Sequence, residues 1–526
     1  MPAIFIQYIS LVIAILLLVM LAQKLKIAYP IVLVIGGLFL SLIPGIPIID
    51  IDPELIFIIF LPPLLYEAAW YTSWKDLWRW RRVVSSFAFL IVIVTAFVIA
   101  IVSSTIIPGF TLALGFLLGG IVSPPDAVSA TSVLKFVKVP KSLSAIIEGE
   151  SLLNDASSLI VFRFALIAVD TGRFVFHEAA LSFVVVIVMG ILTGIAIALL
   201  YYAIHKWLPT TPNMDIVLTL TAPYVMYMAA ESLHFSGVLA VVSGGLFLAA
   251  RSHKILSHSS RIRGANVWST LGFVLNGLVF MLIGLQLPVI TRELGTASLK
   301  DAIMYGVLIT AVLIVTRILS TLGASVFTRF ISRYITTADS NPGWRGPLII
   351  GWAGMRGVVS LAAALSIPIY LSDGSAFPQR NLILFITFMV ILLTLIVQGL
   401  TLPLVIRWVN IKDRDNHLPE KEQELLVKRR LAEHSSKLLA EEPGEHLKTN
   451  KAIQQLKTKL ENDQFSSDDA DAELQDFRKI YLRLLKKQRI FLHELNKEPE
   501  IDEDIIRKYH DLLDLEEEKF RGRYGE

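Results

Sequence analysis

The 526-residue chain contains no cysteine and comparatively few charged residues. The absence of cysteine excludes a disulfide, a thiolate metal site and a cysteine nucleophile, and redox chemistry therefore does not indicate the compartment. Charged residues make up 18% of the chain, whereas soluble globular proteins carry about 25%. The net charge is only +3, and the Lys and Arg residues lie between apolar runs and not in one patch, so the sequence does not indicate nucleic-acid binding. We therefore expect most of the chain to lie in a membrane.

Apolar residues make up 54% of the chain. Because a helix needs about 20 apolar residues to cross the hydrocarbon, the sequence predicts thirteen spans. The first has neither the basic start nor the small-residue cleavage site of a signal peptide, so we expect it to be retained. The predicted spans lie near residues 3–23, 27–43, 55–70, 83–107, 111–134, 142–169, 178–203, 215–232, 235–250, 265–287, 301–328, 346–371 and 379–408.

Basic residues concentrate in loops that fall on one side of the membrane when the spans alternate. The loops on the other side, such as residues 48–54, are acidic or neutral. Since basic loops stay in the cytoplasm, this asymmetry predicts an odd number of spans, with the N-terminus outside and the tail inside. The basic loops are residues 24–26, 75–82, 135–141, 205–206, 251–263 and 329–345.

Composition changes after residue 410, which separates a predicted transmembrane domain (1–410) from a predicted helical cytosolic tail (411–526). The tail is rich in Lys, Glu, Asp and Gln, with helical periodicity near residues 425–439, 453–460, 477–495 and 505–520. Both a solvated appendage and a domain that binds a regulator or contacts a dimer partner fit this pattern.

The fifth and twelfth spans are each interrupted midway. Ser-Pro-Pro-Asp126 interrupts the fifth span, and Gly-Met-Arg-Gly357 interrupts the twelfth. If spans 1–6 and 8–13 are two six-helix repeats, both breaks fall at the fifth position of a repeat, and the repeats are inverted. Helices broken at corresponding positions of inverted repeats indicate a transporter's central site. The predicted fold is thus an all-α polytopic membrane protein.

Two acidic residues, Asp126 and Asp155, lie inside apolar stretches of the chain. A carboxylate at membrane depth is unfavourable unless it is paired, hydrated or protonated, so such residues indicate an ion or proton path. Pro124 and Pro125 remove two backbone donors and free carbonyl groups that can face a cation. Asp126 suits the positive N-terminal end of the second half-helix, or serves simply as its N-cap. The combination favours a carrier that exchanges cations for protons.

The sixth span presents two polar faces. Ser151 and Asp155 are four residues apart and share one face, and Glu150 and Asn154 share the other. Ser151 and Asp155 are predicted oxygen ligands for a small monovalent cation. Asn154 is suited to satisfy backbone groups freed by the break.

Glu150 requires a cationic partner, and the candidates are Arg317 and Arg356. Such a pair would be structural, because breaking a buried ion pair costs about 3–5 kcal/mol. Arg356 also suits the negative C-terminal end of the half-helix in the twelfth span.

Four further polar residues have less definite roles. Glu67, towards the inner end of the third span, either lines an inward funnel and helps to coordinate the ion, or is a solvated interfacial acid. Arg163 follows Asp155 on the sixth span and either influences it or pairs elsewhere. Glu231 and His234 lie near the outer end of the eighth span, where a histidine is more often simply hydrated, although it could sense pH.

The three motifs that end in Asp126, Asp155 (Gly-Glu-Ser-Leu-Leu-Asn-Asp) and Gly357 resemble signatures of the monovalent cation–proton antiporter family, specifically its bacterial sodium/proton exchangers. The resemblance covers residues 1 to about 410. It implies a homodimer with a dimer-forming domain and a mobile six-helix core that contains the two crossed, broken helices.

The resemblance also implies site roles. Asp155 would be the main carboxylate that binds ion and proton, and Asp126, Ser151 and backbone oxygens near Pro125 would complete the sodium site. Relatives often have Thr-Asp where this chain has Pro125-Asp126, so one hydroxyl ligand is missing.

In the family, the glutamate of the Glu-Ser pair binds an arginine on the span before the second broken helix, which selects Arg317 over Arg356 for Glu150. The Asn154-Asp155 sequence, as opposed to Asp-Asp, resembles the electroneutral branch.

These residues predict a non-enzymatic antiporter of Na⁺, or Li⁺, against H⁺ in the cell membrane, with the transported ions as substrates and no cofactor. Potassium/proton exchange is the nearest alternative. A cation channel would instead show a carbonyl-lined filter or a charged ring. An intramembrane protease is disfavoured because Asp126 lies in no Gly-x-Gly-Asp context, Ser151 lies in no Gly-x-Ser-Gly context, and His234 lies near the membrane surface.

Overall fold

The computed structural model describes residues 2–43, 58–172, 176–294, 298–334, 339, 341–411, 420–441, 454, 458, 481–492, 509 and 512–520. The chain forms two compact units, Met1–Asp415 and Asn416–Glu526. The predicted acidic loop at residues 48–54 lies outside the described residues, as does most of the tail helix predicted near 453–460.

The first half of the first unit is helical and ends with the long helix α9. Two prolines end α7, and Gly172, with φ of +66°, ends α9 in the left-handed conformation that glycine adopts most readily. The helices are α1 (Pro2–Leu25), α2 (Tyr29–Ser41), α4 (Leu61–Tyr71), α5 (Trp74–Ser85), the π-helical turn η1 (Ser86–Ile91), α6 (Val92–Ile106), α7 (Leu112–Val122), α8 (Ala127–Leu134) and α9 (Lys141–Thr171).

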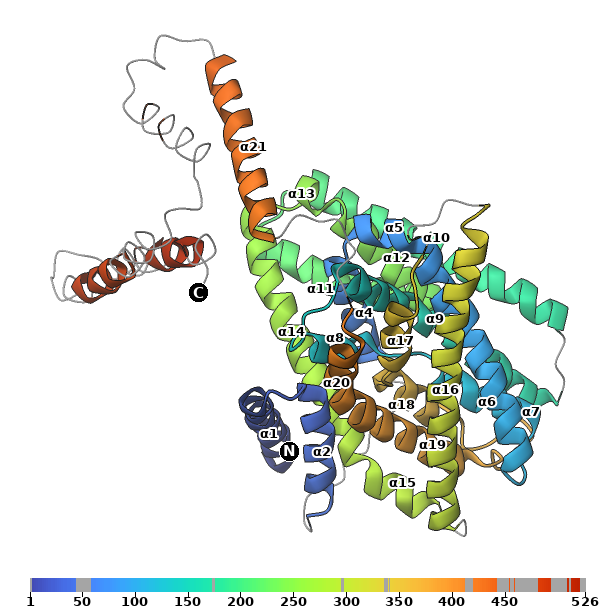
Figure 1. Cartoon of the computed structure of the whole chain (residues 1–526). Helices are drawn as coiled ribbons and strands as arrows, with labels where there is room; N and C mark the ends of the chain where they lie inside the picture. Colours follow the sequence, from blue (N-terminus) through green and yellow to red (C-terminus); the bar gives the residue numbers. More distant parts are fainter. Residues whose placement is uncertain are drawn as a thin grey trace. The chain divides into compact units, whose positions relative to one another are not determined.

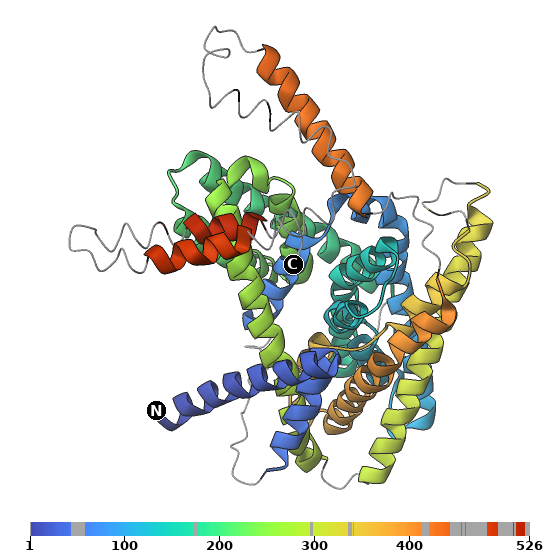
Figure 2. The same cartoon turned by 60° about the vertical axis from the view of Figure 1, so that its left-hand side comes forward.

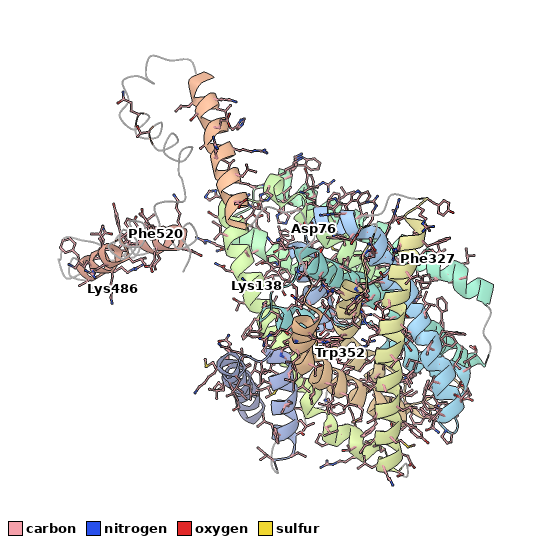
Figure 3. All side chains as sticks on the ribbon, viewed as in Figure 1. Asp76, Lys138, Phe327, Trp352, Lys486 and Phe520 are labelled. Carbon is pink, nitrogen blue, oxygen red and sulfur yellow. The ribbon has the colours of Figure 1, made fainter. Side chains whose placement is uncertain are left out.

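The second half continues in the same way, and its long helix α14 packs beside α1 and α2 (Figure 2). Trp352, at the end of α17 (labelled in Figure 3), donates a hydrogen bond of 3.0 Å to Oγ1 of Thr401 on α20. The helices are α10 (Phe176–Trp207), α11 (Pro212–Ser232), α12 (Gly237–Ala249), α13 (Ser252–Ile255), α14 (His258–Leu285), α15 (Leu287–Glu293), α16 (Leu299–Ile331), α17 (Arg345–Trp352), α18 (Val358–Leu365), α19 (Arg380–Leu393), the π-helical turn η2 (Thr394–Gln398) and α20 (Gly399–Val409).

The prediction of an all-α membrane protein is confirmed, since the described residues contain many apolar helices and no strand. Seven helical segments in this part of the chain are long and apolar enough to cross a membrane, and three shorter apolar helices accompany them. Every predicted span overlaps one of these helices or the helices α4, α11 and α17–α18. The count of thirteen spans and the inverted repeats stay predictions.

Both predicted interruptions are breaks in the helices, and they lie in the middle of the first unit (Figure 1). Residues 123–126 separate α7 from α8, and residues 353–357 separate α17 from α18. The two breaks are in direct contact, because the Asp126 amide donates a hydrogen bond of 2.7 Å to the Met355 carbonyl. Glycine allows this approach: a Cβ atom on Gly357 would lie 2.6 Å from Cγ of Asp126, and one on Gly354 would overlap the Arg317 side chain.

The apolar interior of the first unit consists of two clusters. The first cluster includes Leu117, Phe280 and Phe385 and joins α2, α6–α9 and α14–α20. The second cluster includes Tyr66 and Met226 and joins α4 and α10–α12 with parts of α9 and α14. Helix α9 therefore lies between two bodies of packed side chains. Its residues Leu153 and Leu159 pack against both clusters.

The second unit contains α21 (Glu420–Glu441) and helical segments at residues 481–492 and 512–520, all within or overlapping the predicted tail helices. The two later segments pack together. Arg489 pairs with Asp514 and Glu517, each at 2.6 Å, and the rings of Tyr481 and Phe520 lie 4.5 Å apart.

Candidate ion-binding site

Asp126 lies where the two broken helices meet. Its carboxylate accepts hydrogen bonds from the Val128 amide at 3.2 Å, from the Ser129 amide at 3.1 Å and from the Ser129 hydroxyl at 2.5 Å. Asp126 is thus the N-cap of α8, which is one of the two roles considered from the sequence. The capping role and a position at the positive end of a half-helix coincide here.

Helix α9 binds the backbone groups of the first break. The Asn154 side-chain amide donates a hydrogen bond of 2.9 Å to the Pro125 carbonyl, and the Ser151 hydroxyl accepts one of 3.0 Å from the Ala127 amide. Each of these two acceptor oxygens keeps a second lone pair. These two backbone groups at the break are therefore satisfied by α9, with acceptor capacity left for a cation.

Asp155 lies one helical turn beyond Ser151 on α9 and is 9% exposed. In contrast to Asp126, its carboxylate accepts no hydrogen bond from the described part of the chain. A buried carboxylate without such partners is unfavourable unless a proton or a cation neutralises it. Asp155 is the acid in this region that most requires a bound cation or proton.

A cavity of about 560 Å³ leads to these groups. Asp126, Ser151, Asp155 and Pro125 all line it. On α9 the lining runs from Glu148 to Asp155 and does not continue towards the end of the helix. Its other polar lining residues include Tyr71 and Thr72 at the end of α4 and Lys135 after α8, so the cavity extends towards the predicted cytoplasmic loops.

Glu67 shares this cavity. It lies on α4, and its carboxylate packs so closely on α14 that a Cβ atom at Gly272 would overlap it. Of the two roles considered from the sequence, this position fits a residue that lines the inner funnel.

Glu150 faces away from the cavity and binds Arg317 of α16. The contact is bidentate, with Nη1–Oε1 and Nη2–Oε2 distances of 2.9 Å each. Both residues are buried, with 1% and 3% of their surfaces exposed. Of the two candidate partners, the structure places Arg317, and not Arg356, at this carboxylate.

Arg356 is 1% exposed and donates hydrogen bonds to carbonyl groups at the ends of α7 and α17, the half-helices that precede the two breaks. Its Nε donates to the Val122 carbonyl at 2.6 Å, its Nη2 donates to the Ser123 carbonyl at 3.0 Å, and its Nη1 donates to the Gly354 carbonyl. The sequence-based expectation placed Arg356 at the half-helix of its own span or at Glu150, and did not include the carbonyl groups of α7. Because the breaks are in contact, one guanidinium reaches the C-terminal carbonyls of α7 as well.

Arg163 does not pair with Asp155. Its Nη2 lies 2.9 Å from Oε2 of Glu231, and its Nη1 lies 3.5 Å from the His234 carbonyl. The sequence had left the roles of these three residues open. The structure joins them at the predicted outer end of α9.

One buried network was missed from the sequence. Nδ1 of His205 lies 2.9 Å from Asp215, whose other carboxylate oxygen accepts a hydrogen bond of 2.7 Å from Ser260. The network joins the ends of α10, α11 and α14. The sequence contained one signal for this network, because His205 lies at the end of one apolar run and Asp215 at the start of the next.

Among the described residues, no group of three or more His, Asp or Glu side chains could hold a metal ion as a resident cofactor.

The sequence matches the family model described as "Sodium/hydrogen exchanger, transmembrane" over residues 10–408. The chain belongs to the sodium/hydrogen exchanger family. The family prediction is thereby confirmed, and this is a family of transporters.

Individual members of the sodium/hydrogen exchanger family agree with this assignment. The chain is 32% identical to the "Sodium, potassium, lithium and rubidium/H(+) antiporter" of Bacillus pumilus, over 95% of this chain and 76% of that protein. It is 33% identical to the "Low-affinity Na(+)/H(+) antiporter NhaS1" of Synechocystis, over 77% of this chain and 74% of that protein. The fold matches the sodium proton antiporter MjNhaP1 of Methanocaldococcus jannaschii, with a TM-score of 0.62, 19% identity, and coverage of 78% and 99%.

Proposed function

We propose that this chain is a secondary antiporter that exchanges Na⁺ for H⁺ across the cell membrane, with both ions competing for Asp155. The observation that carries the proposal is the Asp155 carboxylate, which is buried, lines a cavity and has no hydrogen-bond donor among the described residues. Family membership over residues 10–408 supports the same function.

Competition follows from the two ways in which the Asp155 charge can be neutralised. The apolar surroundings favour the protonated acid, and a bound cation favours the carboxylate. Because an uncompensated carboxylate is costly to carry through low dielectric, the site changes sides only when a proton or a cation occupies it. This rule couples the two fluxes and prevents a leak.

The cation would be held by hard oxygen atoms around the first break. We assign Asp155, Asp126 and Ser151 as ligands, with the Pro125 carbonyl as the backbone ligand and Glu67 on the approach to the site. All five line the cavity that extends towards the cytoplasmic loops. The cavity would therefore admit ions from the inner side in this state.

The remaining charged groups would support the site. Arg356 neutralises half-helix ends, Asn154 satisfies the Pro125 carbonyl, and the Glu150–Arg317 pair ties α9 to α16. We further propose that the chain forms a homodimer and that its tail, from residue 411, is cytoplasmic and contacts a regulator or the dimer partner.

Potassium/proton exchange is the second candidate. The printed name of the Bacillus pumilus relative includes potassium, lithium and rubidium beside sodium. This chain also has Pro125 where a threonine hydroxyl often stands in the family. A site with one hydroxyl ligand fewer would select less strongly for Na⁺ over the larger K⁺.

One experiment tests both function and substrate. A pH gradient is imposed on proteoliposomes, and its dissipation is measured after adding Na⁺, Li⁺ or K⁺, with and without a valinomycin clamp of the membrane potential. The proposal expects saturable dissipation with Na⁺ that the clamp does not change, as for electroneutral exchange. Dissipation by none of the cations would refute antiport, and a response to K⁺ alone would establish the second candidate.

A further inference from the structure

Asp155, Leu159 and Arg163 lie at intervals of four residues on α9 and therefore share one face of the helix. At 1.5 Å per residue, Arg163 lies about 12 Å beyond Asp155 along the helix axis. On α9 the cavity is lined from Glu148 to Asp155 and by no later residue of this helix. Leu159 and Arg163 thus occupy the part of this face where a path to the outer side would run.

Leu159 closes this part of the face with apolar contacts. It is partly buried and packs against both apolar clusters, and so fills the boundary between the body that contains the broken helices and the body formed by α4 and α10–α12. Movement of one body against the other would expose Leu159 first on the outer side.

Arg163 forms an ion pair across the same boundary. Its guanidinium binds Glu231, at the end of α11, at 2.9 Å. The two side chains are 44% and 34% exposed, so the contact forms at the rim of the closed region and not inside it.

Glu231 is itself held firmly on the side of the second cluster. Its Oε1 accepts a hydrogen bond of 3.1 Å from the Gly237 amide at the start of α12. The turn between α11 and α12 closes around it, with the Phe235 amide donating to the Ala230 carbonyl at 2.9 Å and His234 in the left-handed region, φ +61°. Arg163 therefore meets a fixed acceptor across a boundary that has to move.

We propose that Arg163 and Glu231 form a latch that keeps the outer side of the transport path closed while the cavity is open on the inner side. The pair acts through the position of α9 and not by contact with the ion, so both are positioning residues. A contact made in only one of two states shifts their equilibrium by its own free energy. For an exposed ion pair this corresponds to a shift of about 1.4- to fivefold.

The absence of native cysteine makes accessibility directly measurable. Leu159→Cys introduces a single thiol, and its labelling by a membrane-impermeant maleimide is followed from the outer face of oriented vesicles. In the Arg163→Gln or Glu231→Gln background we expect labelling about 1.4- to fivefold faster. The double charge reversal Arg163→Glu/Glu231→Arg should restore slow labelling only in part, because an arginine at position 231 cannot accept the hydrogen bond of the Gly237 amide.

Asp170→Asn is the matched control. Asp170 is also near the outer end of α9, but it accepts a hydrogen bond of 2.8 Å from the Ser372 amide, in the loop that follows α18. The neighbouring Leu371 packs against the first cluster, so the contact does not cross the boundary. Asp170→Asn should label at the parent rate. Parent-rate labelling in both single variants, or equal acceleration in Asp170→Asn, would overturn the latch.

If Leu159→Cys fails to fold, sided kinetics provide a second test. Without a latch, the Na⁺ KM should fall at the outer face and rise at the inner face, whereas a merely structural defect would lower kcat at both faces. Equal KM changes at the two faces would refute the proposal. The latch rests on the proposed function, in which the site changes sides of the membrane. Labelling needs no transport, so a failure of antiport and a failure of the latch remain distinguishable.

Discussion

Removal of one partner from the Glu150–Arg317 pair should destabilise the protein more than loss of any exposed ion pair. Glu150→Gln leaves the Arg317 guanidinium buried without its carboxylate, since the two residues are 1% and 3% exposed and joined by two bonds of 2.9 Å. Breaking such a pair costs about 3–5 kcal/mol. The Nε atom of Arg317 has no hydrogen-bond partner among the described residues, so this guanidinium is already incompletely satisfied before Glu150 is changed.

The chain contains a suitable control for this prediction. The Arg163–Glu231 pair has the same distance of 2.9 Å but is 44% and 34% exposed, and its loss should cost about 0.2–1 kcal/mol. Equilibrium unfolding in mixed micelles measures Glu150→Gln, Arg317→Met and Arg163→Gln side by side. The double variant Glu150→Leu/Arg317→Met should be more stable than either of its single variants, because no unpaired charge remains.

Equal stability of Glu150→Gln and Arg163→Gln would refute the reasoning. So would a double variant that is as unstable as the sum of the two single variants, because the pair would then show no coupling. Either result would mean that water or an unassigned group satisfies the Arg317 guanidinium.

Three further predictions concern the first break and the site. Asn154→Leu leaves the Pro125 carbonyl without its amide donor and should destabilise the protein by about 1–3 kcal/mol in the same unfolding assay; an unchanged midpoint would contradict it. Gly357→Ala should raise the Na⁺ KM, because the new Cβ would lie 2.6 Å from Cγ of Asp126. Gly264→Ala is the control and should leave the KM unchanged, because the nearest atom to its new Cβ is 3.9 Å away. Equal KM values in the two variants would be inconsistent with a ligand role for Asp126. The Na⁺ KM should rise as the pH falls, by up to about tenfold per pH unit, because protons displace the cation from one carboxylate; a pH-independent KM would exclude competition.

Much of the fold could be predicted because its signals are local in sequence. The Pro-Pro pair before Asp126 and the glycines at 354 and 357 interrupt apolar runs that are otherwise long enough for a helix, and both breaks are present. Asp155 is predicted as a site residue because it is an acid inside an apolar stretch, and it lines the cavity.

Contacts between distant segments could be predicted only in part. The reach of Arg356 to the carbonyls of α7 depends on two breaks that touch, and spacing within one span does not show this. Similarly, the pairing of Arg163 with Glu231 depends on how α9 packs on the turn between α11 and α12. Charge at a span end has many possible partners, and tertiary packing selects among them.

The most direct test of the shared carboxylate is calorimetric titration of the purified protein with Na⁺ in buffers of different ionisation enthalpy, which counts the protons released when the cation binds. At a pH near the midpoint of its pH–activity profile, the parent protein should release protons when Na⁺ binds. A folded Asp155→Asn variant should neither bind Na⁺ nor release protons. Sodium binding without proton release, or proton release that persists in Asp155→Asn, would contradict the account.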